Sequence, residues 1–423
     1  MQSPLPPLLR IAFPERHIHF SFTRPNTALP SPSEPLDLYI HLPFCRHICA
    51  FCPYVKQVYD ARTAAEYQHA LLRELEHYRS EWGEAQIRSV YFGGGTPSLT
   101  PEIVETTLSW LARRFHLSRE VGVEVHPLDA TAEVVQRLKG AGVTMVSLGV
   151  QTFSDRLLRL LERGYDAAQV TAACDAVLNA GFGTADIDLI FALPGQRLEE
   201  SLTDFARATA VGFEQISTYP LIQFADTALA ARLRATNVRL PSRREERRML
   251  DALVRSARDA GYERSSIWSF NRPGAARYTT VTRDSFLGIG AGASSRLADR
   301  FQVNTFSVPD YIEATRNGSP AGLGTRMNNG DRMAYWLFWR CYDTVIDLGR
   351  FRELFGRELP GRLRLVFQLL CSIGLAHREG SMLRLTDSGA YLFHLVEKNY
   401  THSYLERLWA ACRREPWPQR VVL

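Results

Sequence analysis

The sequence contains no long hydrophobic run. None of its uninterrupted apolar stretches approaches the roughly 18 residues that a membrane-spanning helix needs. The N-terminus also lacks the order of charged, apolar and small residues that marks a secretory signal. We therefore expect a cytoplasmic protein that does not act at a membrane.

Lysine is scarce: of the 50 basic residues only three are lysines, and the other 47 are arginines. The base composition of a GC-rich genome explains this bias more simply than selection for anion binding. The formal net charge is only +5, and stretches such as 243–248 mix arginine with glutamate, which is typical of a solvated helix face. The charge therefore requires no nucleic-acid partner, and we expect none.

Cysteine is also scarce, with seven residues in 423, which argues against a scaffold built from disulfides. Three cysteines are grouped as C-x-x-x-C-x-x-C at Cys45, Cys49 and Cys52, a spacing that random placement rarely produces. The four isolated cysteines are expected to be small buried or partly buried residues: Cys174, Cys341, Cys371 and Cys412.

Apolar strands alternate with helical patterns through the first half of the chain. This alternation predicts an α/β fold with a parallel sheet, whose successive strand–helix units curl into a barrel or part of one. In such barrels the chemistry lies where the strands end. The six predicted strands span residues 38–42, 87–92, 121–125, 143–149, 185–192 and 215–219.

The rest of the chain predicts one further region on each side of the barrel. Residues 1–36 are rich in proline and serine and predict an extended arm. Residues 37–319 contain the barrel and a less regular extension. Residues 320–423 predict helices and one hairpin, which together resemble a small helical or winged-helix domain.

The three grouped cysteines suit an iron–sulfur cluster. Three thiolates can occupy three corners of a cubane and leave the fourth iron open to chelate an amino and a carboxyl group. A structural zinc ion is the alternative, with His41 or His47 as the fourth ligand. The glycines at 93–95 follow the next predicted strand and let the backbone approach a ligand closely, which favours the cluster.

Taken in order, these motifs resemble the radical S-adenosylmethionine (SAM) superfamily and, more narrowly, the oxygen-independent coproporphyrinogen III oxidase (HemN-like) family. The resemblance covers roughly residues 38–400 and implies a partial (β/α)6 TIM-like barrel with a HemN-type C-terminal domain. The matching motifs are LYIHLPFC at 38–45, the cysteine loop, YFGGGTP at 91–97, Glu124 within 123–127, SLGVQTF at 147–153, Arg163, IDLI through LPGQ at 187–196, and 287–293.

The resemblance also implies the cofactors and their ligands. Cys45, Cys49 and Cys52 would hold a [4Fe–4S] cluster that reductively cleaves SAM to a 5′-deoxyadenosyl radical, with flavodoxin or ferredoxin as electron donor. Family members bind a second SAM beside the first, which places Tyr39, Thr96, Ile222 and residues 278–280 near that molecule. The methionine end of the first SAM would contact Gly94, Gly95 and Thr96, and its polar clamp would be Glu124, Gln151, Arg163 and Asp188.

Two positions depart from the family pattern. Tyr54 stands where coproporphyrinogen oxidases typically carry a further cysteine, and residues 277–283 lack the His-Asn…Tyr-Trp element of the related haem chaperones. We therefore predict the class C methylase branch or its cyclopropane-forming relatives. In these, a second SAM donates a methylene or methyl group to an sp² carbon of an aromatic or heteroaromatic natural product. Tyr54 and Tyr278 are the candidate catalytic residues, although either could be an ordinary packed aromatic.

Three alternatives remain open from the sequence. A coproporphyrinogen oxidase would release CO₂ from its substrate, and a haem chaperone would bind haem without turnover. A zinc-stabilised protein that binds nucleic acid would use the winged-helix-like C-terminal region.

Overall fold

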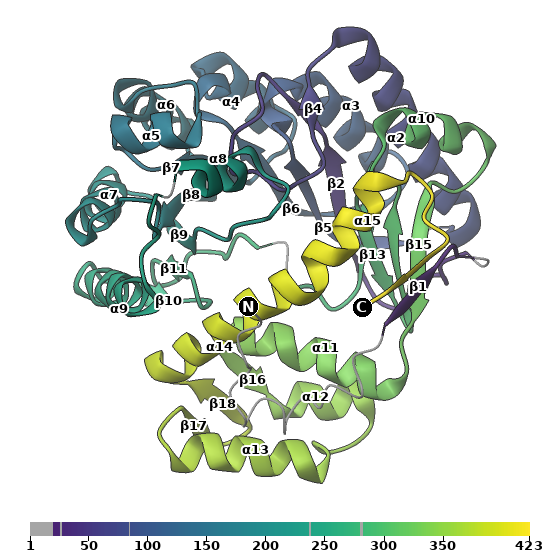
Figure 1. The fold of residues 1–423 in the computed structure, drawn as a ribbon. Helices are drawn as coiled ribbons and strands as arrows, with labels where there is room; N and C mark the ends of the chain where they lie inside the picture. The colour runs from purple at the N-terminus through teal and green to yellow at the C-terminus, as the bar shows by residue number, and fades with distance from the viewer. Residues whose placement is uncertain (1–19, 26–27, 84, 237, 280–281) are drawn as a thin grey trace.

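A computed structural model describes residues 20–25, 28–83, 85–236, 238–279 and 282–423. Figure 1 shows a curved sheet with helices along its outer side and a smaller helical region below it. The predicted arm at 1–36 falls largely outside the described residues, and so does Thr280 of the predicted cofactor segment. The predicted boundaries at residues 36 and 319 stay predictions. No described helix has both the length and the apolar character needed to cross a membrane.

Seven parallel strands form the centre of the sheet, in the order β9-β8-β7-β6-β5-β2-β12. The predicted α/β fold is confirmed, and the six predicted strands occupy consecutive places in this order. Their bounds are β2 Leu36–Leu42, β5 Gln86–Gly94, β6 His116–Val125, β7 Met145–Gln151, β8 Thr184–Phe191, β9 Gln215–Pro220 and β12 Phe286–Ile289.

The barrel does not close. Strand β2 pairs with β12 rather than with β9, and from β12 the sheet continues in antiparallel pairs. The sequence did not predict β12 as a strand, because its apolar run is only four residues long, is interrupted by Gly288 and is followed at once by further glycines. The added strands are β13 Ser294–Leu297, β14 Arg300–Asn304, β15 Ala321–Arg326, β1 Ser21–Thr23 and β19 Arg420–Val422 beyond β12, and β11 Ser269–Asn271 and β10 Glu263–Arg264 beyond β9.

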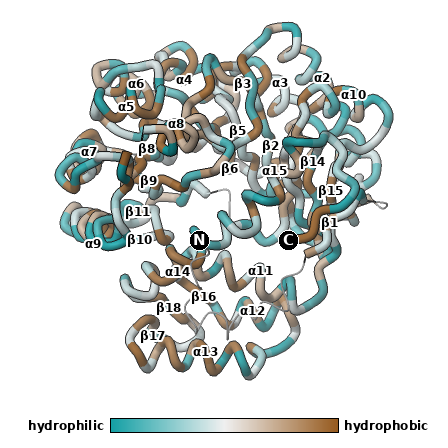
Figure 2. The backbone as a smooth tube through the Cα atoms, in the orientation of Figure 1, coloured by the Kyte–Doolittle hydropathy of each residue, from teal (hydrophilic) through white to brown (hydrophobic). Residues whose placement is uncertain are grey.

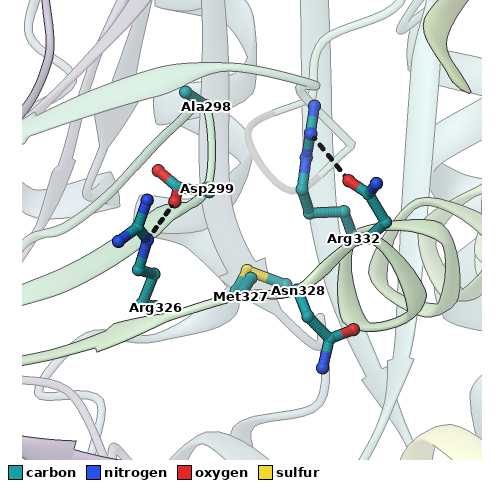
Figure 3. Close-up of a pocket in the computed structure, with 7 residues that line it drawn as sticks. Ala298, Asp299, Arg326, Met327, Asn328 and Arg332 are labelled. Carbon is teal, nitrogen blue, oxygen red and sulfur yellow. Dashed lines mark hydrogen bonds and ion pairs between the residues drawn. The ribbon is translucent and has the colours of Figure 1, made fainter.

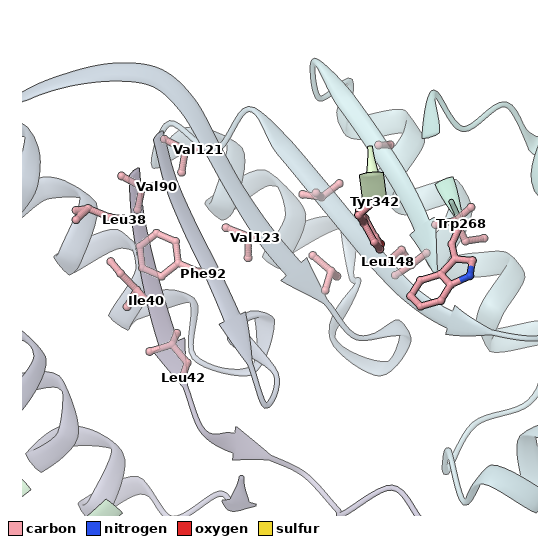
Figure 4. Packing of buried hydrophobic residues seen from close by; sticks show 14 of the residues in the cluster. Leu38, Ile40, Leu42, Val90, Phe92, Val121, Val123, Leu148, Trp268 and Tyr342 are labelled. Carbon is pink, nitrogen blue, oxygen red and sulfur yellow. The ribbon is translucent and has the colours of Figure 1, made fainter. Parts of the chain in front are cut away.

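The helices cover the outer face of the sheet with their apolar sides. Helix α2 begins after Asp60, whose carboxylate caps the backbone N–H of Thr63, and it buries Tyr67, Leu71 and Leu75. Figure 4 shows buried apolar side chains of this cluster on the strands, among them Leu38, Phe92 and Val123, and in Figure 2 apolar residues recur along the strands. The other helices here are α3 Pro101–Ala112, α4 Ala132–Gly140, α5 Asp155–Leu161, α6 Ala167–Ala180, α7 Leu198–Val211, α9 Arg243–Asp259 and α10 Val308–Asn317, and α2 spans Ala61–Trp82. Helix α8, Ala228–Thr236, packs instead on α5 and the cysteine loop.

The C-terminal region combines helices with a three-stranded antiparallel sheet, in the order β16-β18-β17. Its last two helices, α14 and α15, run across the open side of the barrel in Figure 1. Its elements are α11 Asn329–Tyr342, β16 Val345–Asp347, α12 Leu348–Phe355, α13 Gly361–Ser372, β17 Ala376–Glu379, β18 Met382–Leu385, α14 Asp387–Tyr400, a π-helical turn Thr401–Leu405 and α15 Glu406–Arg414.

A buried hydrogen-bond chain fixes α14 to the barrel. The indole Nε1 of Trp268 donates to His394 Nδ1 at 2.9 Å, and His394 Nε2 lies 2.5 Å from a carboxylate oxygen of Glu246 on α9. Lys398 Nζ completes the chain by donating to Glu246 at 2.8 Å. Because His394 is fully buried, this chain holds α14 in one orientation over the strand ends.

A second buried network ties α2 to the strands on the other side of β2. The carboxylate of Glu74, only 2% exposed, accepts hydrogen bonds from Gly290 N (2.9 Å), Asn304 Nδ2 (2.8 Å) and the Tyr311 hydroxyl (2.6 Å). Burial raises the pKa of Glu74 to about 7, although these three donors oppose the shift. The network fixes the turn after β12 against α2.

We expect Glu74→Ala to lower the free energy of unfolding by about 3 kcal/mol, because it leaves three buried donors without an acceptor. Glu74→Gln keeps one acceptor oxygen and should lose less. Urea denaturation monitored by circular dichroism measures both changes. Equal midpoints for Glu74→Ala and the wild type would show that the network does not stabilise the fold.

Candidate functional site

A cavity of about 500 Å³ lies at the carboxyl ends of the parallel strands, beneath α14 and α15. A second cavity of about 320 Å³ adjoins it and shares Tyr54, Gly94 and Glu124 among its lining residues. Tyr39 lines the second cavity. The other predicted site residues all line the first: Cys45, Cys49, Cys52, Tyr54, Gly94, Gly95, Thr96, Glu124, Gln151, Arg163, Asp188, Ile222 and Tyr278.

Two short strands hold the ends of the cysteine loop together, and the cysteines of the loop line the cavity. Strands β3 Phe44–Cys45 and β4 Gln57–Val58 pair in parallel, so that the loop leaves and returns at one point. Lys56 Nζ donates to the carbonyl oxygens of Cys52 (2.7 Å) and Tyr54 (3.0 Å). These bonds fix the loop backbone without using the thiols, which are free cysteines.

Burial and Arg163 determine the surroundings of the thiols. Burial raises the pKa of Cys45 to about 12 and also raises that of Cys52, so both thiols stay protonated until a metal displaces the proton. Arg163 Nη1 lies 3.1 Å from Cys49 Sγ, and its other nitrogens donate to Tyr165 Oη (2.7 Å) and Gly149 O (2.6 Å). The fixed guanidinium thus places a hydrogen-bond donor beside the sulfur of Cys49.

The two candidate zinc-ligand histidines are engaged elsewhere. His41 Nε2 donates to Val55 O at 2.8 Å and its Nδ1 accepts from the Tyr39 hydroxyl at 3.0 Å, while His47 Nε2 lies 3.0 Å from Glu162 O. Within the described part of the chain, no three His, Cys, Asp or Glu side chains are arranged to hold one metal ion. A cubane binds each thiolate to a different iron, so three separated thiols fit a cluster better than a single ion.

The glycines at the end of β5 let the cysteine loop approach the sheet. A Cβ on Gly94, whose φ is +117°, would lie 2.6 Å from the His41 ring, and one on Gly95 would lie 2.7 Å from Phe44 O. The sequence attributes these glycines to ligand approach. The structure adds a packing requirement, because the His41 ring at Gly94 and the Phe44 backbone at Gly95 occupy the space of the missing side chains.

Glu124 fastens the end of β5 to that of β6. Its carboxylate accepts from Gly94 N (3.0 Å) and from the Tyr91 hydroxyl (3.1 Å). Burial raises the pKa of Glu124 to about 7, and the nearby Asp188 adds to the shift. The group can therefore change its charge in the neutral pH range, depending on what occupies the cavity.

Asp186 is a cavity residue that the sequence analysis missed. Ser147 Oγ lies 3.2 Å from Asp186 Oδ2 and 2.8 Å from Asp188 Oδ2, and Ser217 Oγ lies 3.1 Å from both oxygens of Asp186. Burial raises the pKa of Asp186 and raises that of Asp188 to about 6. The two-residue spacing on one strand places both carboxyls on the same face, a signal that was available in the sequence.

The C-terminal helices supply the rest of the cavity wall. The Trp409 ring lies 5.8 Å from that of Tyr54 and stacks on Phe224 at 5.5 Å, and Arg413 donates to Pro53 O and to Asp226. These contacts hold α15 against the cysteine loop. No sequence signal identifies Trp409 as a site residue, because it lies more than 350 positions from the loop it contacts.

Replacing Cys45, Cys49 or Cys52 with serine should abolish most of the bound iron and sulfide and the brown colour of anaerobically reconstituted protein. The matched control is Cys371→Ser, which changes a half-buried cysteine on α13 and should leave iron content unchanged. Full iron and sulfide content in Cys52→Ser would contradict a three-cysteine cluster site.

Known proteins resemble this chain over most of its length. The radical SAM superfamily model matches residues 39–206. The chain is 30% identical over 363 residues to the haem chaperone HemW of Bacillus subtilis, covering 84% of this chain and 96% of the relative. It is 29% identical over 301 residues to the oxygen-independent coproporphyrinogen III oxidase of Salmonella typhimurium, covering 67% of this chain and 66% of the relative.

The fold is also known. The structure of coproporphyrinogen III oxidase (HemN) from Escherichia coli superposes with a TM-score of 0.76 at 21% sequence identity, covering 95% of this chain and all of that one. This match includes the C-terminal region. The [4Fe–4S] cluster and SAM are the cofactors of this superfamily.

These relatives correct one prediction. The predicted transfer of a methylene or methyl group to a natural product is wrong, because the relatives that match over most of the chain are named haem chaperone and coproporphyrinogen oxidase. We took the departures at Tyr54 and at residues 277–283 as evidence for the methylase branch. Departures as short as these do not identify the reaction. The chain belongs to the radical SAM superfamily and, within it, to the family of HemW and the oxygen-independent coproporphyrinogen III oxidase HemN.

Proposed function

We propose that the chain is an oxidase of the coproporphyrinogen type, which converts a propionate side chain of a reduced tetrapyrrole to a vinyl group. The observation that carries the proposal is the single chamber formed by the thiols, the strand-end polar residues and the aromatic wall of the C-terminal helices. A cofactor held at the strand ends would face a substrate held against that wall. This arrangement supports catalysis inside the chamber rather than delivery of a bound ligand.

The chemistry of the change is an oxidative decarboxylation. When bound, the cluster and SAM supply a 5′-deoxyadenosyl radical by one-electron cleavage of a carbon–sulfur bond. The propionate side chain loses one hydrogen atom to that radical, and then CO₂ and one further electron to an acceptor, which leaves a vinyl group. The electron acceptor is a partner of the reaction, in addition to the donor that reduces the cluster.

The roles of the chain's own residues follow from their positions. Arg163 is expected to bind the SAM carboxylate, while Glu124, Gln151 and Asp188 bind its amine and ribose hydroxyls. Gly94, Gly95 and Thr96 would contact the methionine end. Trp409 of the aromatic wall, together with Tyr54 and Tyr278 on the barrel side of the cavity, excludes water from the radical.

The haem chaperone is the second candidate, because the match to the Bacillus subtilis relative covers 96% of that protein. The test is anaerobic reconstitution with iron, sulfide, SAM and reductant, followed by addition of coproporphyrinogen III. An oxidase should form 5′-deoxyadenosine, CO₂ and a vinyl-bearing product. Stoichiometric uptake of haem without any product from coproporphyrinogen would instead support the chaperone.

SAM binding should strengthen as the pH rises from about 6 to 8. The pKa of Glu124 near 7 means that its carboxyl is neutral below this range and anionic above it, and the anion attracts the sulfonium charge of SAM and accepts hydrogen bonds from its amine more strongly. Glu124→Gln should bind SAM more weakly at pH 8 and show a flatter pH profile. Isothermal titration calorimetry on the reconstituted protein measures both, and an unchanged profile in the variant would rule out Glu124 as the titrating group.

A further inference from the structure

A band of polar side chains crosses the inner side of the barrel over strands β7, β8 and β9. We call it the polar band and define it by Ser147, Asp186, Asp188, Gln215 and Ser217. Strand pairing sets Ser147 and Gln215 on either side of Asp186, and it sets Ser217 beside Asp188. Apart from Asp188, the members are at most 2% exposed, so their hydrogen bonds must be made within the protein.

The backbone of Tyr278 fixes the direction of hydrogen bonding at one end of the polar band. Its N–H donates to Gln215 Oε1 at 2.9 Å, and its carbonyl oxygen accepts from Gln215 Nε2 at 2.9 Å. A backbone N–H can only donate and a carbonyl oxygen can only accept, so the amide of Gln215 has one orientation. Gln215 Nε2 therefore also donates to Ser217 Oγ, at 3.2 Å.

Ser217 continues this direction to Asp186. Its Oγ lies 3.1 Å from both oxygens of the Asp186 carboxyl. Because the hydroxyl already accepts from Gln215, its own proton is available for Asp186. The Asp186 carboxyl thus receives one hydrogen bond from the side of β9.

Ser147 lies between the two carboxyls of β8. Its Oγ is 2.8 Å from Asp188 Oδ2 and 3.2 Å from Asp186 Oδ2. A hydroxyl has a single proton, and the shorter distance identifies the Asp188 carboxylate as its acceptor. The contact between Ser147 and Asp186 is then a hydrogen bond only if Asp186 donates.

Asp186 can donate only as a neutral carboxylic acid, and its surroundings favour that form. In the described part of the chain its hydrogen-bond partners are two serine hydroxyls and the backbone N–H of Ile187, with no basic side chain among them. Burial raises the pKa of Asp186, and the nearby charge of Asp188 raises it further. Arg163 acts on the other carboxyl and lowers the pKa of Asp188.

The remaining titratable groups around the pair agree with this assignment. Glu124 on β6 faces Asp188 rather than Asp186. The hydroxyls of Tyr219 and Tyr278 face both carboxyls and stay neutral, because burial raises the pKa of each well above its usual value. The pair therefore consists of a neutral acid, Asp186, and an anion, Asp188.

We infer that Asp186 is a positioning residue for SAM, a neutral donor that acts through Ser147 to hold the Asp188 carboxylate in the orientation that binds the ribose. The inference rests on the role of Asp188 in the proposed function and deepens it. Ser147 occupies Oδ2 of Asp188, which leaves Oδ1 as an acceptor for a ribose hydroxyl. A carboxylate that is already fixed loses less conformational freedom when the ligand binds.

The test measures SAM binding to the reconstituted protein by isothermal titration calorimetry at pH 8. Asp186→Asn keeps a neutral donor and an acceptor of similar shape, so the dissociation constant should stay within about twofold of the wild type. Asp186→Leu removes both groups and should raise it about tenfold. Ser147→Ala breaks the link while both carboxyls remain, and it should raise the dissociation constant by about the same factor even if Asp186→Leu fails to fold.

Two control variants match these losses. Ser295→Ala removes a buried hydroxyl that bonds to the backbone of Gly288 and lines neither cavity. Asp299→Leu removes a carboxylate that pairs with Arg326 in a separate pocket (Figure 3), whose described lining residues are all different from those of the cavity. Both controls should leave the dissociation constant for SAM unchanged.

Infrared difference spectroscopy supplies a readout that a purely structural role would not change. The spectrum of the reconstituted wild type minus that of Asp186→Asn, at pH 8, should contain the C=O stretch of a protonated carboxylic acid. Isotope labelling of the aspartate carboxyls should shift this band.

The outcomes separate the inference from the proposed function. A loss of SAM affinity in Asp186→Asn as large as in Asp186→Leu, or absence of the infrared band, would show that Asp186 acts as an anion and would overturn the inference. An unchanged dissociation constant in Ser147→Ala would overturn it as well. Conversion of coproporphyrinogen III by the wild type decides the proposed function separately: if it fails while the variants behave as expected, the proposed function falls and the inference stands.

Discussion

The close approach of the cysteine loop to the end of β5 is the constraint on which the site depends. Parallel pairing of β2 with β5 sets Leu42 beside Gly94, and the loop then leaves directly over glycines that could not carry a side chain. At the same place Gly94 N donates a hydrogen bond to the carboxylate of Glu124, which fixes the end of β6 as well. One close packing contact thus brings the thiols, the glycine turn and the first polar clamp residue to one edge of the sheet.

The C-terminal helices turn this edge into a chamber. The chain Trp268–His394–Glu246 sets the position of α14, and Trp409 and Arg413 hold α15 against the cysteine loop. Radical chemistry requires that water and oxygen stay away from the reacting atoms, and a lid of aromatic side chains provides this without introducing charge. The lid is fixed by buried polar bonds, so the closed arrangement belongs to the fold itself.

The cavity is acidic at the strand ends. It contains Glu124, Asp186 and Asp188, whose carboxyls suit a cationic sulfonium cofactor.

The sequence by itself determined the parallel α/β fold, the cysteine loop and the series of residues at the strand ends. These signals are local, because a strand pattern or a motif spacing involves only residues that are close in the sequence. The ends of parallel strands then meet at one edge of the sheet, which brings the motifs together. Only the tertiary structure decided that β12 extends the sheet beside β2 and that Trp409 faces Tyr54. Those contacts join positions far apart in the chain, and long-range packing, rather than any local pattern, selects them.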